Sequence, residues 1–187
     1  MAVRLDAAAE PKDLENLARA KFLRGERLAV ENLADELNVS RATAYRWAGN
    51  IERLTGRIVA QIVEATHRRC LREAKGKGWE RIRDVNARGL RYIVASRPYQ
   101  QFLARDPETA LRIVATKEGP VQATTVRLQQ ELIEEEARRG TIKLRVDAHT
   151  LAYAVVRLSE SFLYADLIAG EEPDMDKAVE VMALLLR

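Results

Sequence analysis

Hydrogen-bonding and aromatic side chains are concentrated near the N-terminus, between two segments with helical apolar spacing. Positions 40 to 47 hold Ser40, Arg41, Ala42, Thr43, Tyr45, Arg46 and Trp47. Hydroxyl, guanidinium and indole donors on the first turns of a helix can reach phosphates and base edges in a DNA major groove. The stretch therefore predicts DNA binding. An ordinary amphipathic hairpin with Tyr45 and Trp47 packed inward would have the same spacing, so spacing alone does not decide between the two interpretations.

A second polar and aromatic group lies in the most apolar helical segment, residues 150–169. Its members are Tyr153, Arg157, Glu160 and Tyr164, spaced by four, three and four. At ~100° per residue all four fall on one stripe of an α-helix. Because a helix that is apolar on most other sides is deeply packed, the stripe lines a cavity, lies in a subunit seam or faces water. If it lines a cavity, we expect Tyr92 and Phe102 among the other walls and a small, neutral or weakly polar ligand.

Other reactive side chains give weaker signals. His67 and Cys70 are one helical turn apart, but one thiol and one imidazole do not complete a zinc site. The sequence contains neither a GxSxG motif nor a GxxxxGK motif. We therefore expect no enzyme activity, no cofactor and no metal.

Composition restricts the class of protein that carries these groups. The chain has 187 residues, of which 47% are hydrophobic and 32% charged, and a single cysteine. The first residues lack the apolar run of a signal peptide, and no segment approaches the roughly twenty apolar residues of a membrane span. We expect a cytoplasmic protein that is not in a membrane. Residues 1–50 carry no net charge, whereas residues 51–105 carry eight more basic than acidic side chains.

Helical spacing predicts how the rest of the chain positions the two groups. Strict alternation of apolar and polar residues is absent, so we expect an all-α fold with about nine helices. The expected helices follow Pro11, end at Leu37, begin after Ser40 and Asn50, and span residues 79–96, 120–140, 150–169 and 174–186, with short pieces through Phe102 and Leu111.

The first polar group falls in a predicted helix-turn-helix. A short helix ending at Leu37, a tight turn at Asn38 and Val39, and a new helix capped by Ser40 have the dimensions of this motif. Asn38 suits the turn, because Asn tolerates the left-handed backbone conformation better than most residues with a side chain.

Residues 28–54, LAVENLADELNVSRATAYRWAGNIERL, resemble the DNA-binding motif of the TetR family of transcriptional regulators. Residues 151–186 resemble the QsdR-type branch of that family. The resemblance implies a DNA-binding region at residues 1–55 and an effector-binding and dimerisation region at residues 56–187. It also implies a homodimeric repressor that a small molecule releases from a double-stranded DNA operator, with lactone-like compounds as candidate effectors.

The resemblance assigns roles to residues of the second helix of the motif. It implies that Ser40 caps this helix, that Arg41, Ala42 and Thr43 face bases and phosphates, and that Tyr45 and Trp47 contact phosphates, whereas Arg46 occupies a variable place. It also implies that the last two long helices form the dimer seam, in which we expect Leu163 and Leu184.

Three residues depart from the family pattern. Ala29 replaces the usual hydroxyl at the start of a helix, Glu31 stands where a basic residue is common, and Ile51 replaces a frequent phosphate-binding lysine. These departures favour an alternative, a ligand-binding dimer of the same fold with weak operator binding that acts through protein partners. A more remote alternative is an enzyme that uses Glu160 and Tyr153 on a bound lactone.

Overall fold

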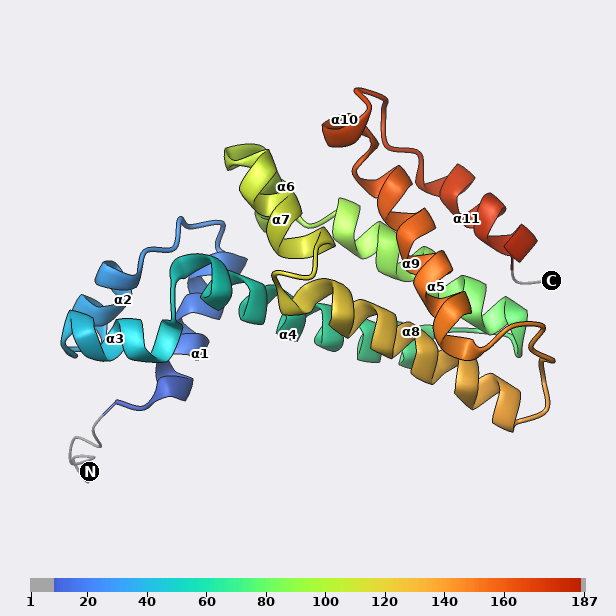
Figure 1. Cartoon of the computed structure of the whole chain (residues 1–187), viewed down its shortest axis with the longest axis horizontal. Coiled ribbons are helices and arrows are strands. Elements are labelled where there is room, and N and C mark those ends of the chain that lie inside the picture. The colour runs from blue at the N-terminus through green and yellow to red at the C-terminus, as the bar shows by residue number, and fades with distance from the viewer. Residues whose placement is uncertain (1–8, 186–187) are drawn as a thin grey trace.

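The chain is helical throughout the part that the structure describes. The computed structural model describes residues 9–185, and within them there are eleven helices and no strand (Figure 1). The all-α prediction is confirmed, and the expected number of about nine helices is corrected to eleven.

The helices form two groups joined by long helices (Figure 1). Three short helices, α1 (Pro11–Leu23), α2 (Val30–Glu36) and α3 (Arg41–Ala48), form one end of the molecule. The long α4 (Ile51–Glu73) leads away from them, and α8 (Pro120–Arg138) packs along it. The other end consists of α5 (Trp79–Val94), α9 (Ala148–Leu163), the short α10 (Ala165–Ile168) and α11 (Met175–Leu185), while α6 (Arg97–Arg105) and α7 (Pro107–Ala115) lie nearer the first group.

The structure locates the boundary between the short helices expected through Phe102 and Leu111, and it adds a boundary that the sequence-based prediction lacked. Asp106 ends α6 and caps α7, where its side chain accepts a hydrogen bond of 3.1 Å from the backbone N–H of Thr109. Tyr164 ends α9, so the single helix expected at residues 150–169 is wrong. The side chain of Tyr164 is buried at this break, and its backbone has left the helical conformation.

Predicted helix starts at Ser40, Asn50 and Asp174 are confirmed by side-chain caps. The Asn50 side-chain oxygen accepts from the backbone N–H of Arg53 at 2.8 Å, and Asp174 accepts from that of Lys177 at 2.9 Å. Each cap satisfies a backbone donor that has no partner within its helix. The expected end of the last helix at Leu186 lies outside the described residues.

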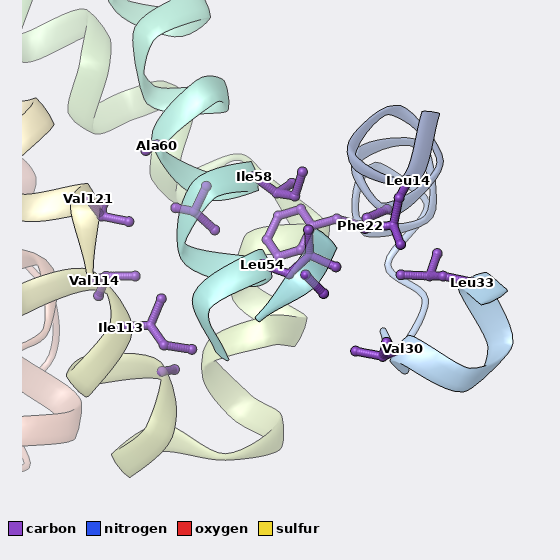
Figure 2. Packing of buried hydrophobic residues seen from close by; sticks show 14 of the residues in the cluster. Leu14, Phe22, Val30, Leu33, Leu54, Ile58, Ala60, Ile113, Val114 and Val121 are labelled. Carbon is purple, nitrogen blue, oxygen red and sulfur yellow. The ribbon is translucent and has the colours of Figure 1, made fainter. Parts of the chain in front are cut away.

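An apolar core joins the first three helices to α4. Leu14, Leu33, Leu54 and Ile58 are fully buried in it, and Figure 2 shows their side chains pointing toward one another. The same core continues to Ile113, Val114 and Val121 on α7 and α8. It therefore crosses residue 55, the predicted boundary between two regions, so α4 belongs to the packing of both.

A second core fills the far end of the molecule, between α5, α8, α9 and α11. A buried carboxylate lies near the C-terminal end of α8. Glu136 accepts hydrogen bonds from the Gly78 N–H at 2.7 Å, from Arg81 at 2.6 Å and from the Thr141 hydroxyl at 2.8 Å. Gly78 has a φ of +57°, and a Cβ there would stand 2.7 Å from the Thr141 carbonyl oxygen. The loop after α4 is thereby fixed to the end of α8.

None of the helices in the described part of the chain is long and apolar enough to cross a membrane.

Candidate DNA-binding surface and effector cavity

The turn between α2 and α3 has the predicted geometry. Asn38 adopts a left-handed conformation with a φ of 52°, and the Val39 N–H donates to the Ala34 carbonyl at 3.0 Å. At the start of α3, Ser40 Oγ accepts from the Thr43 N–H at 3.1 Å and donates to Thr43 Oγ1 at 2.9 Å. These bonds fix both hydroxyls at the first turn of α3.

Most of the predicted DNA-binding side chains lie on the exposed face of α3. Ser40, Arg41, Ala42, Tyr45 and Arg46 are exposed, and Thr43 is half-buried. Trp47 is half-buried and packs against the N-terminal core, whereas 42% of Tyr45 is exposed. The inward-packed alternative therefore describes Trp47 but not Tyr45.

Glu31, one of the departures from the family pattern, is paired with this face. The Tyr45 hydroxyl donates a hydrogen bond to Glu31 Oε1. This bond lowers the pKa of Glu31 and raises the pKa of Tyr45. Ala29 makes no side-chain cap at the start of α2, and Ile51 is half-buried against the N-terminal core. Of the three departures, only Glu31 adds a charge beside α3, and that charge has a hydrogen-bond partner.

Arg57 on α4 holds the end of α3 and was not predicted from the sequence. Its guanidinium donates to the carbonyls of Trp47 at 3.0 Å and Ala48 at 3.1 Å, and to Glu15 on α1 at 2.8 Å. A cation at a helix C-terminus interacts favourably with the helix dipole. Arg57 therefore ties α4 directly to the C-terminal end of α3.

A cavity of about 210 Å³ lies between α4, α5, α8 and α9. Its walls are mainly apolar and include Val59, Ile62, Val63, Val85, Leu90, Val114, Val121, Leu128, Val156 and Leu163. Three of the six predicted effector-binding residues line it, namely Tyr92, Glu160 and Tyr164.

The other three predicted residues lie elsewhere. Phe102 packs between Phe22 and Tyr99, with ring centroids 5.6 Å and 6.0 Å away. Tyr153 is 49% exposed, and Arg157 is also exposed on the outside of α9. The stripe is divided because α9 borders the cavity only with its C-terminal half, from Val156 onward. Glu160 and Tyr153, the pair suggested for lactone chemistry, therefore do not share a site.

Glu160 is the acidic group of the cavity, and its side chain is only 12% exposed. Arg157 donates to its Oε2 at 2.6 Å and also to the Ala115 carbonyl at the end of α7, at 3.0 Å. Burial raises the pKa of Glu160 to about 7, although the charge of Arg157 opposes this shift. Glu160 is thus partly protonated near neutral pH, and its ion pair connects α9 with α7.

Two tyrosines form a buried polar pair beside Glu160. The hydroxyls of Tyr99 on α6 and Tyr164 are 2.7 Å apart, and both residues line the cavity. Burial raises the pKa of Tyr99 to about 12 and that of Tyr164 well above its usual value, so both stay protonated. Tyr99 was not predicted from the sequence, because its contact lies 65 residues away along the chain.

Gln129 on α8 is a further cavity residue that the sequence did not indicate. It is only 4% exposed, and its Nε2 is buried without a hydrogen-bond partner among residues 9–185. Other amide and charged residues surround it in the sequence of α8, so nothing in the local pattern distinguishes it from them.

Comparison with known proteins shows the class to which this arrangement belongs. A family model described as "Tetracyclin repressor-like, C-terminal domain" matches residues 77–187. The chain belongs to the TetR family of transcriptional regulators.

Two solved structures are similar to the chain. The transcriptional repressor QsdR of R. erythropolis is 29% identical, covers 94% of this chain and 93% of its own, and superposes with a TM-score of 0.89. The regulator PfmR of Thermus thermophilus is 18% identical, with 95% of this chain and 96% of its own covered and a TM-score of 0.45. No match was found among curated proteins.

Proposed function

We propose that the chain is a homodimeric transcriptional repressor that binds a double-stranded DNA operator through α3 and leaves it when a small molecule enters the cavity. The observation that carries this proposal is the exposed, donor-bearing face of α3 on a chain that resembles a transcriptional repressor over 94% of its length. Residues 1–55 are the proposed DNA-binding region, and residues 56–187 the proposed effector-binding and dimerisation region.

The face of α3 supports operator binding through its chemistry. Arg41 and Arg46 are exposed cations, and the hydroxyls of Ser40 and Thr43 stand at the first turn. Arginine can bond two acceptors of a guanine edge, whereas hydroxyls contact phosphates or bases. We assign Ser40, Arg41, Ala42, Thr43, Tyr45 and Arg46 to the DNA surface, and Trp47 to its support from beneath.

The cavity supports a small effector with a largely apolar body. Its volume of about 210 Å³ is below the about 300–1,000 Å³ of most ligand pockets, which favours a small molecule. We assign Tyr92, Glu160 and Tyr164 to effector binding together with Tyr99. A lactone-like compound, the candidate that the sequence resemblance implies, is an effector of this kind.

A chain of contacts supports coupling between the cavity and α3. Arg157 ties Glu160 to the end of α7, and α7 is in turn bound to α4 by the ion pair of Arg112 with Glu52 at 2.8 Å. Arg57 then joins α4 to α3. An effector that moves α7 would therefore change the direction of α4, and with it the separation of the two α3 helices in a dimer. Half-sites one DNA turn apart, ~34 Å, tolerate little change of this kind.

Exposed apolar residues on α9, α10 and α11 support the dimer. Leu184 is 68% exposed, and Leu185, Tyr153 and Ile168 are also exposed. Pairing this surface across a two-fold axis would remove it from water.

The proposal is tested by selecting DNA fragments that the protein binds and measuring affinity for them. Arg41→Ala is expected to weaken binding by about 1–3 kcal/mol per half-site, as for a lost base contact. The matched control is Arg138→Ala at the far end of α8, which is expected to leave affinity unchanged.

Failure to select any DNA, with the dimer intact, would reject operator binding and favour a regulator that acts through protein partners. Equal affinity of Arg41→Ala and Arg138→Ala would move Arg41 out of the DNA surface.

A further inference from the structure

We propose that the effector is an uncharged molecule that presents a carbonyl-type hydrogen-bond acceptor to the side-chain amide of Gln129. This inference rests on the effector role proposed for the cavity and names the chemistry of its ligand. The position of the carbonyl, at the Gln129 end of the cavity, is part of the proposal.

Gln129 provides a donor that the protein itself leaves unused. Its side chain is 4% exposed, and Nε2 has no partner among residues 9–185. A buried donor without a partner is costly, and most buried polar groups in folded proteins are paired. In the same helix the fully buried Glu136 follows this rule, with bonds from Gly78, Arg81 and Thr141.

Three other polar residues of the cavity already bond their own helices. The side chains of Ser159, Thr125 and Asn86 donate to the carbonyls four residues earlier, at 2.8 Å, 2.9 Å and 2.8 Å. Such bonds occupy the hydroxyl donors of Ser159 and Thr125 and one of the two N–H donors of Asn86. Unlike these three, Gln129 holds a buried nitrogen with no partner among residues 9–185, which a new acceptor would satisfy.

Water can serve Gln129 while no ligand is bound. At ~30 Å³ per liquid water, a cavity of about 210 Å³ has room for about seven molecules. A ligand that displaces ordered water loses affinity unless it replaces the water's hydrogen bonds. A purely apolar ligand would leave the Gln129 amide without a hydrogen-bond partner, whereas a carbonyl oxygen would accept a hydrogen bond from it.

The two polar ends of the cavity explain why the ligand is uncharged. His149 at the start of α9 contacts Gln130 at 3.1 Å, and Arg157 near its end contacts Ala115, which precedes α8. Gln129 and Glu160 therefore lie toward opposite ends of α9, whose residues 149 and 160 are ~16 Å apart at 1.5 Å per residue.

Each kind of charged ligand meets an obstacle at one of these ends. A carboxylate would bring a second acidic group to the pair of Glu160 with Arg157, which has only one cation, and the remaining wall of the cavity is mainly apolar. An ammonium group would find Glu160 already paired with Arg157, and it has no acceptor for the unpartnered Nε2 of Gln129. Burial also lowers the pKa of His67, which favours the uncharged imidazole in the wall.

The test uses four probes of similar size, namely 2-octanone, nonane, octanoate and octylamine, with binding to the full-length protein measured by calorimetry. We expect 2-octanone to bind more tightly than the other three. Gln129→Leu is expected to weaken 2-octanone binding about tenfold and to leave nonane binding unchanged or stronger. The matched control is Gln122→Leu on the same helix, outside the cavity, which is expected to change neither.

Gln129→Leu replaces an unpaired amide with an apolar group of similar size, so we expect it to fold and to melt no lower than the wild type. The proposal is overturned if none of the probes binds, if octanoate or octylamine binds more tightly than 2-octanone, or if Gln129→Leu binds the ketone as well as the wild type does. DNA release is measured separately. If 2-octanone binds through Gln129 but leaves DNA binding unchanged, the ligand chemistry stands and the effector role of the cavity fails.

Discussion

The surface of α3 and the cavity beneath α9 differ in how far their polar side chains are hydrogen-bonded within the protein. On α3, Ser40 bonds Thr43, and Tyr45 bonds Glu31, so the side chains are held in place before any partner arrives. In the cavity, the Gln129 amide has no partner among the described residues, and burial keeps Glu160 partly protonated. The difference indicates that the side chains of α3 are already positioned for a partner outside the molecule. The cavity instead keeps a polar group that only a molecule bound inside it would satisfy.

Packing differs in the same way between the two regions. Around the first three helices the core is closed, with Leu14, Leu33 and Leu54 fully buried. The second region retains a cavity and an exposed apolar surface on α9 and α11. Its stability should therefore depend on what binds to it, because a ligand or subunit that binds only the folded state stabilises it.

The largest expected effect comes from the exposed surface of the second region. Leu184→Glu is expected to convert the dimer to a monomer and to abolish measurable operator binding, because it places a charge in an apolar seam. Light scattering at micromolar concentration reports the mass. Lys177→Glu, an exposed change on the same helix, is the control.

A dimeric Leu184→Glu protein would show that the seam lies elsewhere. Leu163 is not suited to this test, although we expected it in the seam, because it is buried and lines the cavity. Leu163→Glu would damage the fold whether or not a dimer forms.

Glu160 should make the stability of the second region depend on pH. Its pKa rises from 4.5 to about 7 on folding, so between these values the folded protein holds a proton that the unfolded chain has released. The free energy of unfolding of the wild type should therefore fall as the pH rises through this interval. Glu160→Gln cannot ionise and should be the more stable protein at pH 8, by up to about 3 kcal/mol, with little difference at pH 4.

Denaturant titrations of both proteins at the two pH values measure this difference. The same offset at pH 4 and pH 8 would contradict a raised pKa. Glu134→Gln, on the solvent side of α8, controls for the general effect of removing a carboxylate.

Two glycines within helices allow the packing of the α4–α8 contact and of the cavity wall to be compared directly. A Cβ at Gly56 on α4 would lie 3.0 Å from Pro120 Cδ, whereas a Cβ at Gly89, in the cavity wall, would meet nothing within 4 Å. Alanine is favoured over glycine in a helix by up to about 1 kcal/mol, and overpacking costs about 1–3 kcal/mol. Gly89→Ala is expected to raise the free energy of unfolding by up to about 1 kcal/mol, and Gly56→Ala to lower it by about 1 kcal/mol.

Thermal or denaturant unfolding distinguishes the two variants. If both glycines respond alike, the contact between α4 and α8 is no tighter than the cavity wall.

The smallest expected effect concerns the prepared surface of α3. Tyr45→Phe removes the hydrogen bond to Glu31, and because this bond is exposed to solvent, stability should change little. Operator affinity should fall several-fold, because an unpaired Glu31 carboxylate would stand beside the phosphates. Ser161→Ala, an exposed residue of α9, is the control for loss of a hydroxyl. An unchanged affinity would place Glu31 away from DNA.

Local signals were sufficient to predict much of the fold. Asn38 marks the turn, and Ser40, Asn50 and Asp174 mark helix starts, because each acts on backbone groups within three residues. The break at Tyr164 was missed, because it accompanies contacts with another helix rather than a glycine or proline.

The candidate sites were only partly predictable for the same reason. Helical spacing shows which residues of one helix share a face, and it brought Glu160 and Tyr164 together. It does not show where a cavity ends along that helix, so Tyr153 was included wrongly. Arg57 bonds Glu15 across 42 residues, and no local pattern announces such a contact.

The tie between Gly78 and Glu136 gives α4 the mechanics of a lever. With 23 residues at ~1.5 Å each, α4 is about 34 Å long, and the loop that follows it is fastened to α8. Its other end carries Arg57, which holds α3. If the fastened end is the fulcrum, a rotation of about 5° moves the free end by about 3 Å over that length. The mechanical advantage lies with displacement rather than force, so a small shift of the stretch of α4 that lines the cavity, Val59 to Cys70, is enlarged at the DNA end.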